Sequence, residues 1–166
     1  PIVEPRHVGF DGAGVVLELG PGVTGLKLGD RVAIVDTRGT YAERLLVEEH
    51  NAIPIPRDVS DEVAAAIGIP ASTAYQALRS LDVRAGDTLL VHAGSGAVGQ
   101  AAVQFAVDRG ATVIATASAA HHDRLRQLSA IPVEYGPGLV ERVRTVAPFG
   151  VTAILDAAGT DEAWAS

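Results

Sequence analysis

The sequence predicts an α/β protein in which a β-rich first part precedes a doubly wound parallel sheet. Short apolar runs separated by glycine turns occupy residues 14–47, a pattern that favours antiparallel β structure. From residue 88 onward, strand-like apolar runs alternate with stretches of helical periodicity. Such alternation is typical of a parallel sheet covered by helices. A glycine-rich loop, residues 94–99, joins the first of these later strands to the first helix.

The first part is predicted to contain three strands, each bounded by turn residues. The strands are expected at residues 14–19, 31–35 and 41–47, with turns at 20–22 and 29–30 and at Gly39. Strands of this length and spacing favour a small barrel or a partly open sheet. Residues 53–56 read Ile-Pro-Ile-Pro and are expected to form an extended connector, because proline cannot donate a hydrogen bond inside a central strand.

Two helices are expected in the middle of the chain. Ser60 is the expected N-cap of the first, since its hydroxyl can accept a first-turn amide. Pro70 is expected to interrupt this helix, because proline lacks the amide that an inner helical position needs. The second helix is then expected to begin at Ser72, again with a capping residue first.

The second part is predicted to alternate between strands and helices. The expected strands are residues 88–92, 112–116, 133–134 and 151–156. Helical spacing of apolar residues occurs over 98–106, around Leu125 and Leu128, and over 139–146. A doubly wound sheet usually needs about six strands, with the fourth placed across the topological switch. The nucleotide crevice can therefore be assembled here, although the last strands are expected to be missing.

The glycine loop between the strand and the helix predicts a dinucleotide site. Gly94 allows the tight turn, Gly96 lets the backbone approach a pyrophosphate, and Gly99 lets the helix pack close to the strand. The amides at the helix start would then face the phosphates. The expected cofactor-binding residues of this loop are Gly94, Ser95, Gly96, Ala97, Val98 and Gly99. The alternative is a glycine-rich turn that binds nothing.

The end of the second strand favours NADPH over NADH. An NAD site usually carries an acidic residue here, which accepts hydrogen bonds from the ribose 2′-hydroxyl. Residues 114–122 contain no carboxylate, and the donors that follow the strand suit a 2′-phosphate. We expect Ser118 and His121 nearest that phosphate, with Arg124 as a further contributor. Alternatively, His121, His122 and Arg124 form only the solvated first turn of a helix.

The composition limits the classes of partner and the cellular location that we expect for this chain. The 166 residues carry a net charge of −7 with scattered basic residues, which argues against a nucleic-acid surface. There is no cysteine, no signal peptide at the start, and no apolar run near the roughly 20 residues that span a bilayer. A cytoplasmic protein without a membrane partner is the simplest expectation. The chain opens without methionine and is expected to be a piece of a longer polypeptide.

Six motifs together resemble the medium-chain dehydrogenase/reductase superfamily, and within it the zinc-independent NADPH:quinone oxidoreductase-like branch. They lie at residues 9–16, 20–25, 28–32, 40–43, 71–75 and 91–99. The resemblance implies that residues 1–70 are part of a GroES-like β-barrel catalytic domain. It implies that residues 71–166 are a Rossmann dinucleotide-binding domain, with the fold incomplete at both ends. In this family the active site lies in the cleft between the two domains.

The departures from the zinc-dependent members imply that the chain binds no metal. Those members carry Gly-His-Glu where this chain has Gly9-Phe10-Asp11, and phenylalanine cannot coordinate a metal. Their structural-zinc lobe needs cysteines, which this chain lacks. The substrate must then accept hydride without a metal to polarise its oxygen. Quinones and α,β-unsaturated carbonyls can do so.

The resemblance also implies roles for residues outside the glycine loop. It places Thr73 near the nicotinamide, and it brings the loop that ends at Gly159 past the cofactor. Tyr41 is the candidate polar group facing the substrate; the alternative is a packed strand aromatic with a solvated hydroxyl. Thr73 could equally be a helix-capping residue beside Ser72. Asp11 is expected near the cleft, or as a structural cap.

Three activities therefore stay open. The first is an NADPH-dependent reductase of a small quinone or enone. The second is an enoyl reductase module of a polyketide synthase, whose sequences share the loop. The third is a non-catalytic NADPH-binding protein of the crystallin kind. Relatives are often dimers, so a homodimer is an expectation by analogy only.

Overall fold

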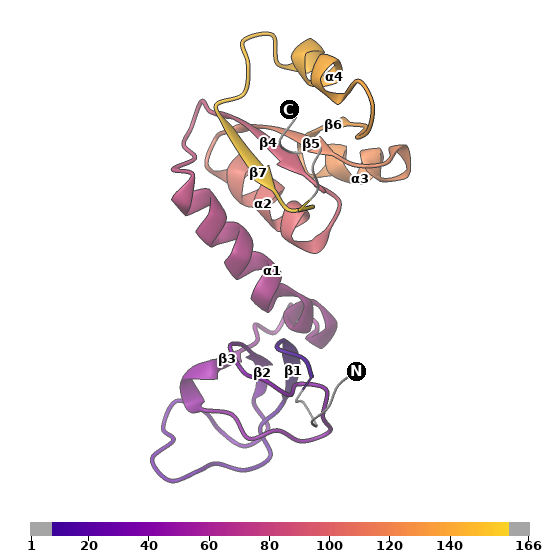
Figure 1. Ribbon diagram of the computed structural model, residues 1–166. Helices are drawn as coiled ribbons and strands as arrows, with labels where there is room; N and C mark the ends of the chain where they lie inside the picture. The colour runs from indigo at the N-terminus through magenta and orange to yellow at the C-terminus, as the bar shows by residue number, and fades with distance from the viewer. Residues whose placement is uncertain (1–7, 160–166) are drawn as a thin grey trace. The chain divides into compact units, whose positions relative to one another are not determined.

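The computed structural model describes residues 8–159 and divides the chain into two compact units, Pro1–Ile69 and Pro70–Ser166 (Figure 1). The boundary lies within helix α1, Asp61–Ser80. The elements of the first unit that precede α1 are β1 (Gly12–Val15), β2 (Arg31–Ile34), a 3₁₀ turn (Glu49–Asn51) and β3 (Ala52–Pro54). Those of the second unit that follow α1 are β4 (Thr88–His92), α2 (Ala97–Asp108), β5 (Thr112–Thr116), a 3₁₀ turn (Ala119–His121), α3 (His122–Gln127), β6 (Ile131–Val133), α4 (Leu139–Val146) and β7 (Ala153–Asp156).

The first unit contains an antiparallel sheet in the order β1-β2-β3. Ala33 of β2 lies opposite Ala13 on one side and Ile53 on the other. The expectation that residues 53–56 form a connector is wrong, because β3 pairs with β2 as far as Pro54. Proline is tolerated there because β3 is an edge strand, whose outer side needs no ladder hydrogen bond.

The strand expected at residues 41–47 is absent from the described structure. A strand is stabilised by pairing and by burying one face. Leu45 and Leu46 are both exposed, so this segment buries no alternating face. The first expected strand, 14–19, is shorter than predicted and ends at Val15.

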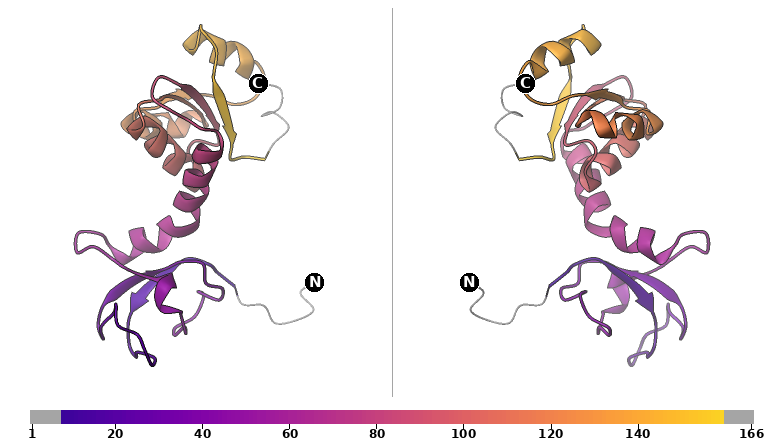
Figure 2. Two further views of the ribbon diagram at one scale, coloured as in Figure 1. Left: turned by 90° about the vertical axis from the view of Figure 1, so that its left-hand side faces the viewer. Right: turned by 90° about the vertical axis from the view of Figure 1, so that its right-hand side faces the viewer.

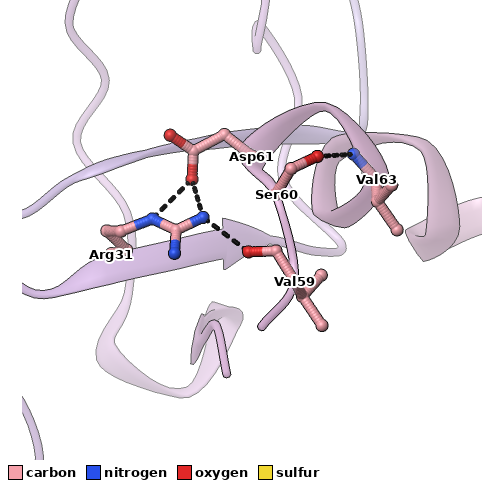
Figure 3. Close-up of polar contacts among 5 residues, drawn as sticks. All are labelled: Arg31, Val59, Ser60, Asp61 and Val63. Atoms are coloured by element: carbon pink, nitrogen blue, oxygen red, sulfur yellow. Dashed lines mark hydrogen bonds and ion pairs between the residues drawn. The ribbon is translucent and has the colours of Figure 1, made fainter. Parts of the chain in front are cut away.

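A cluster of polar contacts anchors the start of α1 to β2 (Figure 3). Arg31 donates from Nε and Nη2 to Asp61 Oδ1, at 2.9 and 2.7 Å, and from Nη2 to the Val59 carbonyl at 2.7 Å. Ser60 Oγ accepts the amide of Val63 at 3.3 Å. The prediction of Ser60 as the N-cap is therefore confirmed.

Helix α1 continues through Pro70, so the predicted interruption there and the new start at Ser72 are wrong. Proline removes one hydrogen bond, but the helix has anchors on both sides of it. Before Pro70, the Asp11 carboxylate accepts the amide of Ile69 at 3.0 Å. After it, Ala74 is fully buried in the core of the second unit. Ser72 and Thr73 are consequently inside a helix and are not N-caps.

The second unit is a parallel sheet in the order β6-β5-β4-β7. Helices α2 and α3 cover one face and α4 covers the other (Figure 2). Residues alternate between the two faces along each strand. Leu89 and Val91 of β4 pack in the larger core beneath α2, whereas Leu90 packs in the smaller core beneath α4. The predicted α/β fold and its four parallel strands are confirmed.

Asp87, which precedes β4, connects the amino ends of strands β4, β5 and β7 of the parallel sheet. Its carboxylate accepts the amide of Arg84 at 2.7 Å and the hydroxyl of Thr152, which precedes β7, at 3.0 Å. Its carbonyl accepts the amide of Thr112 in β5 at 2.8 Å. The hydrogen bonds lower the pKa of the Asp87 carboxyl below its ordinary value of 3.8. The bond from the Arg84 amide has the largest effect, followed by the bond from the Thr152 hydroxyl.

We predict that Asp87 contributes stability that is present above pH 3.8 and is lost as the pH falls through its lower folded-state pKa. Protonation is favoured in the unfolded chain, so acid shifts the equilibrium towards unfolding. An asparagine side chain cannot titrate. As the pH falls below 3.8, the urea midpoint of the variant Asp87→Asn should therefore decrease less than that of the unaltered protein. Urea unfolding of both proteins as a function of pH measures the difference. Parallel curves would contradict the role of Asp87.

Candidate functional site

A crevice opens at the carboxyl ends of the parallel strands. Strand β4 has β5 on one side and β7 on the other, so the order of the sheet reverses here. Open α/β sheets bind their ligands outside such a switch point. A cavity of about 220 Å³ lies at this edge. Its lining, all from the second unit, consists of His92, Ala93, Ser95, Thr116, Ala117, Tyr135 and Ala158.

Thr116, the last residue of β5, fixes the start of the glycine loop. Its hydroxyl accepts the amide of Ala93 at 3.1 Å, and its carbonyl accepts the amide of Gly94 at 2.8 Å. Ala93 has a φ of +52°, a conformation that is unfavourable for a residue with a side chain. The two bonds to Thr116 help to hold this conformation. No local sequence pattern marks Thr116 for this role, because the role depends on the register between β4 and β5.

The three glycines of the loop differ in what a side chain at each position would meet. A Cβ on Gly94 would lie 2.6 Å from the Ala115 Cβ. A Cβ on Gly99 would overlap the Ala93 carbonyl oxygen and lie 2.7 Å from the Gly94 Cα. A Cβ on Gly96 would meet only the Ala93 carbonyl oxygen, at 3.3 Å, and the φ of Gly96 is an ordinary −72°. Packing therefore excludes a side chain at positions 94 and 99, whereas a Cβ at position 96 would make one tight contact, with the Ala93 carbonyl oxygen.

The start of α2 faces the crevice without a side-chain cap. Gly96 is the N-cap and supplies no side-chain acceptor, and the first turn contains no acidic residue. The first amides of a helix have no intrahelical partner and carry a partial positive charge. Ala97 and Val98 contribute such amides here. The segment from Ser95 to Val98 can therefore bind an anion such as a phosphate.

The segment after β5 presents hydrogen-bond donors rather than carboxylates. Ser118 is half-buried and precedes the 3₁₀ turn that contains His121, which is exposed. The Nε2 of His122 lies 3.2 Å from the Ala117 carbonyl, so His122 bonds to the backbone. The one acidic residue of the next turn, Asp123, pairs with Arg126 at 2.6 Å.

Two loops at the crevice depend on residues that the sequence analysis did not single out. Tyr135 follows β6, and a single guanidinium holds its loop: Arg142 donates to the carbonyls of Glu134, Tyr135, Gly136 and Pro137 at 2.8–3.2 Å. The loop after β7 folds onto Asp156, whose Oδ1 accepts the amides of Ala158 and Gly159 at 2.8 and 3.0 Å. No motif marks a loop that one distant side chain organises.

The two expected catalytic candidates lie outside the lining of this cavity. Tyr41, in the first unit, is 82% exposed, and its amide bonds to the Val8 carbonyl at 3.1 Å. The ring would touch any Cβ placed on Gly9. Thr73 is an exposed residue of α1 in the second unit. The other predicted residues, the glycine loop, Ser118, His121 and Gly159, all belong to the carboxyl side of the parallel sheet.

Between residues 8 and 159, no group of three or more histidine, cysteine, aspartate or glutamate side chains is placed to hold a metal ion. Over the same residues, no helix has both the length and the apolar character needed to cross a bilayer.

We predict that Gly99→Ala lowers the stability of the second unit by about 1–3 kcal/mol, because the added methyl group forces α2 away from the loop. Gly20→Ala is the matched control, since a Cβ there meets nothing within 4 Å. Urea unfolding followed by circular dichroism compares the two. Equal midpoints would show that the close approach of α2 to the loop does not constrain residue 99.

We also predict that Arg142→Ala releases the Tyr135 loop, because a hydrogen bond to a charged group contributes up to about 1.5–3 kcal/mol net of its exchange with water. Amide hydrogen exchange over residues 134–138 should accelerate. Arg144→Ala, which removes only an exposed ion pair with Glu141, should leave these rates unchanged. Unaltered exchange in Arg142→Ala would show that the loop is held by other contacts.

Comparison with known proteins identifies the first unit independently. Residues 2–57 match the alcohol dehydrogenase GroES-like domain. The chain is 35% identical over 159 residues to the synaptic vesicle membrane protein VAT-1 homolog of Homo sapiens, covering 93% of this chain and 40% of that protein. It is 44% identical over 126 residues to polyketide synthase GfsB of Streptomyces halstedii, covering 75% of this chain and 2% of the synthase.

Solved structures match both units. The quinone oxidoreductase from Coxiella burnetii has a TM-score of 0.84 and 34% identity, covering 96% of this chain and 51% of that one. The mycobacterial Rv1454c, solved as a complex with NADPH, has a TM-score of 0.83 and 35% identity, covering 93% and 51%. The chain therefore spans about half the length of these structures. With its GroES-like first unit and its parallel α/β second unit, the chain belongs to the medium-chain dehydrogenase/reductase superfamily and is similar to its quinone oxidoreductases.

Proposed function

We propose that this chain is part of a zinc-independent oxidoreductase that uses NADPH to reduce a quinone or an α,β-unsaturated carbonyl. One observation carries the proposal. The uncapped start of α2 adjoins the cavity at the switch point of the sheet, and Gly96, the N-cap, places no side chain beside these amides. The similarity to quinone oxidoreductases and to a structure solved with NADPH supports the same function.

The residues of the crevice fit a dinucleotide. The amides of Ser95, Ala97 and Val98 would hold the pyrophosphate, because they lie in the loop and first turn where Gly96 keeps the approach open. Ala158 lines the same cavity, and Gly159 adjoins it. Both would pass close to the cofactor. When bound, NADPH supplies a hydride to the substrate.

The polar groups after β5 fit the additional phosphate of NADPH. Ser118 and His121 would lie nearest the 2′-phosphate, and residues 116–122 contain no carboxylate to repel it. Asp123, the nearest acidic residue in the sequence, is engaged by Arg126. Arg124 enters none of the ion pairs formed within residues 8–159, so its charge is not matched by a neighbouring carboxylate there.

The proposed substrate class follows from the absence of a metal-binding side chain at position 10. Phe10 cannot coordinate zinc, and the Asp11 carboxylate is committed to the Ile69 amide. Reduction then requires a substrate whose developing negative charge spreads onto a conjugated oxygen. The chain's part is to orient the substrate, to exclude water and to donate a hydrogen bond to that oxygen. Tyr41 is the proposed donor, and Thr73 is proposed to lie near the nicotinamide.

A second activity is favoured by the similarity to GfsB. The chain would then be an enoyl reductase module of a polyketide synthase, which would reduce an enoyl thioester with NADPH bound at the glycine loop. A non-catalytic NADPH-binding role is the remaining candidate. A cytoplasmic location and a homodimer stay predictions from composition and from analogy.

We predict that Gly96→Val weakens NADPH binding by about 100-fold, because the isopropyl group fills the space kept open at the start of α2. The fold should largely survive, since the one tight contact of the new Cβ, 3.3 Å from the Ala93 carbonyl oxygen, is relieved by a shift of a few tenths of an ångström. Isothermal titration with NADPH, together with the melting temperature, measures both effects. Gly20→Val is the control at a glycine in open space. Unchanged affinity would show that the loop does not hold the pyrophosphate.

The reaction itself is tested by following NADPH absorbance with a small quinone, an enone and an enoyl thioester. Turnover of the quinone or the enone supports the proposed reductase, and turnover of the thioester alone supports the synthase module. Tight binding of NADPH without turnover of any of the three would favour the non-catalytic role. Because the chain spans about half of its relatives, the assay should use the longest natural polypeptide that contains it.

A further inference from the structure

Gln100, in the first turns of α2, bonds to two parts of the crevice at once. Its side-chain Nε2 donates to the carbonyl of Ser95 at 2.8 Å. Its side-chain Oε1 accepts Nε of Arg124 at 3.2 Å. Ser95 belongs to the glycine loop and Arg124 to α3. One amide group therefore joins the segment proposed for the pyrophosphate to the segment proposed for the 2′-phosphate.

The chemistry of the two partners determines which way this amide faces. A backbone carbonyl only accepts hydrogen bonds, and a guanidinium only donates them. The Nε2 must therefore face Ser95, and the Oε1 must face Arg124. Glutamate at position 100 would offer acceptors to both partners and would lose the bond to Ser95.

The bond to Gln100 leaves the positive charge of Arg124 unneutralised. The neighbouring carboxylate, Asp123, pairs with Arg126 at 2.6 Å, and the partner of Arg124 is a neutral amide. A guanidinium with a free charge binds phosphate strongly, and it binds best when its position is fixed in advance. Gln100 fixes one nitrogen of Arg124 and leaves the remaining nitrogens for another acceptor.

We infer that Gln100 is a positioning residue for cofactor choice: it holds Arg124 beside the glycine loop, where the guanidinium selects NADPH over NADH. This inference rests on the proposed function and adds to it a specific residue pair. A purely structural role for Gln100 would stabilise the loop for both dinucleotides equally. The ratio of the NADH and NADPH dissociation constants separates the two roles.

The experiment measures both dissociation constants by isothermal titration, for the longest natural polypeptide that contains the chain and for its variants. Gln100→Glu places a carboxylate on Arg124 and should lower the preference for NADPH about tenfold; Gln100→Ala should lower it about threefold. In an Arg124→Ala background, Gln100→Ala should no longer change the preference. Gln104→Ala is the matched control, because Gln104 also bonds from its side chain to a backbone carbonyl of α2, that of Gln100.

Preference for NADPH that is unaffected by either Gln100 substitution overturns the inference. Equal binding of NADPH and NADH by the unaltered chain overturns it too, while leaving the loop assignment in place. Binding of neither dinucleotide refutes the proposed function itself. Melting temperatures identify a variant that fails to fold. If Gln100→Ala fails to fold, the preference for NADPH is still measured in Gln100→Glu, whose side chain has a similar shape, and in the single variant Arg124→Ala.

Discussion

The candidate site depends on the parallel pairing of β4 with β5, which brings Thr116 under the glycine loop. Through its hydroxyl and carbonyl, Thr116 accepts the amides of Ala93 and Gly94. These bonds help to hold Ala93 in a left-handed conformation, and the chain then turns directly into α2. Gly99 lets α2 pack against this turn. The amides at the start of α2 therefore lie at the edge of the sheet where the strand order reverses.

The sequence predicted the second unit well, because its signals are local. Continuous apolar runs such as 88–92 belong to buried parallel strands, and the glycines between them mark a strand-to-helix turn. The four parallel strands and the crossing to β7 agree with the structure. The residues of the loops after these strands lie together at one edge of the sheet, because the carboxyl ends of parallel strands meet there.

The errors fall where distant contacts outweigh local propensity. Pro70 signals a helix end, yet Asp11, from far along the sequence, accepts the Ile69 amide beside it. The two prolines of residues 53–56 signal a connector, yet β2 offers Ala52–Pro54 an edge to pair with. Tyr135 was not foreseen at the crevice, because its loop is shaped by Arg142 rather than by its own sequence. Such contacts cannot be inferred from residue type or spacing alone.

The proposed function requires that the amides at the start of α2 hold the diphosphate bridge of a dinucleotide. A titration of the ¹⁵N-labelled chain with NADPH, followed through the backbone amide resonances, tests this contact directly. We expect the largest shifts at Ser95, Ala97 and Val98, with a second group at Ser118 and His121 that NADH does not reproduce. Saturable binding that leaves the amides of residues 95–98 unmoved would contradict it.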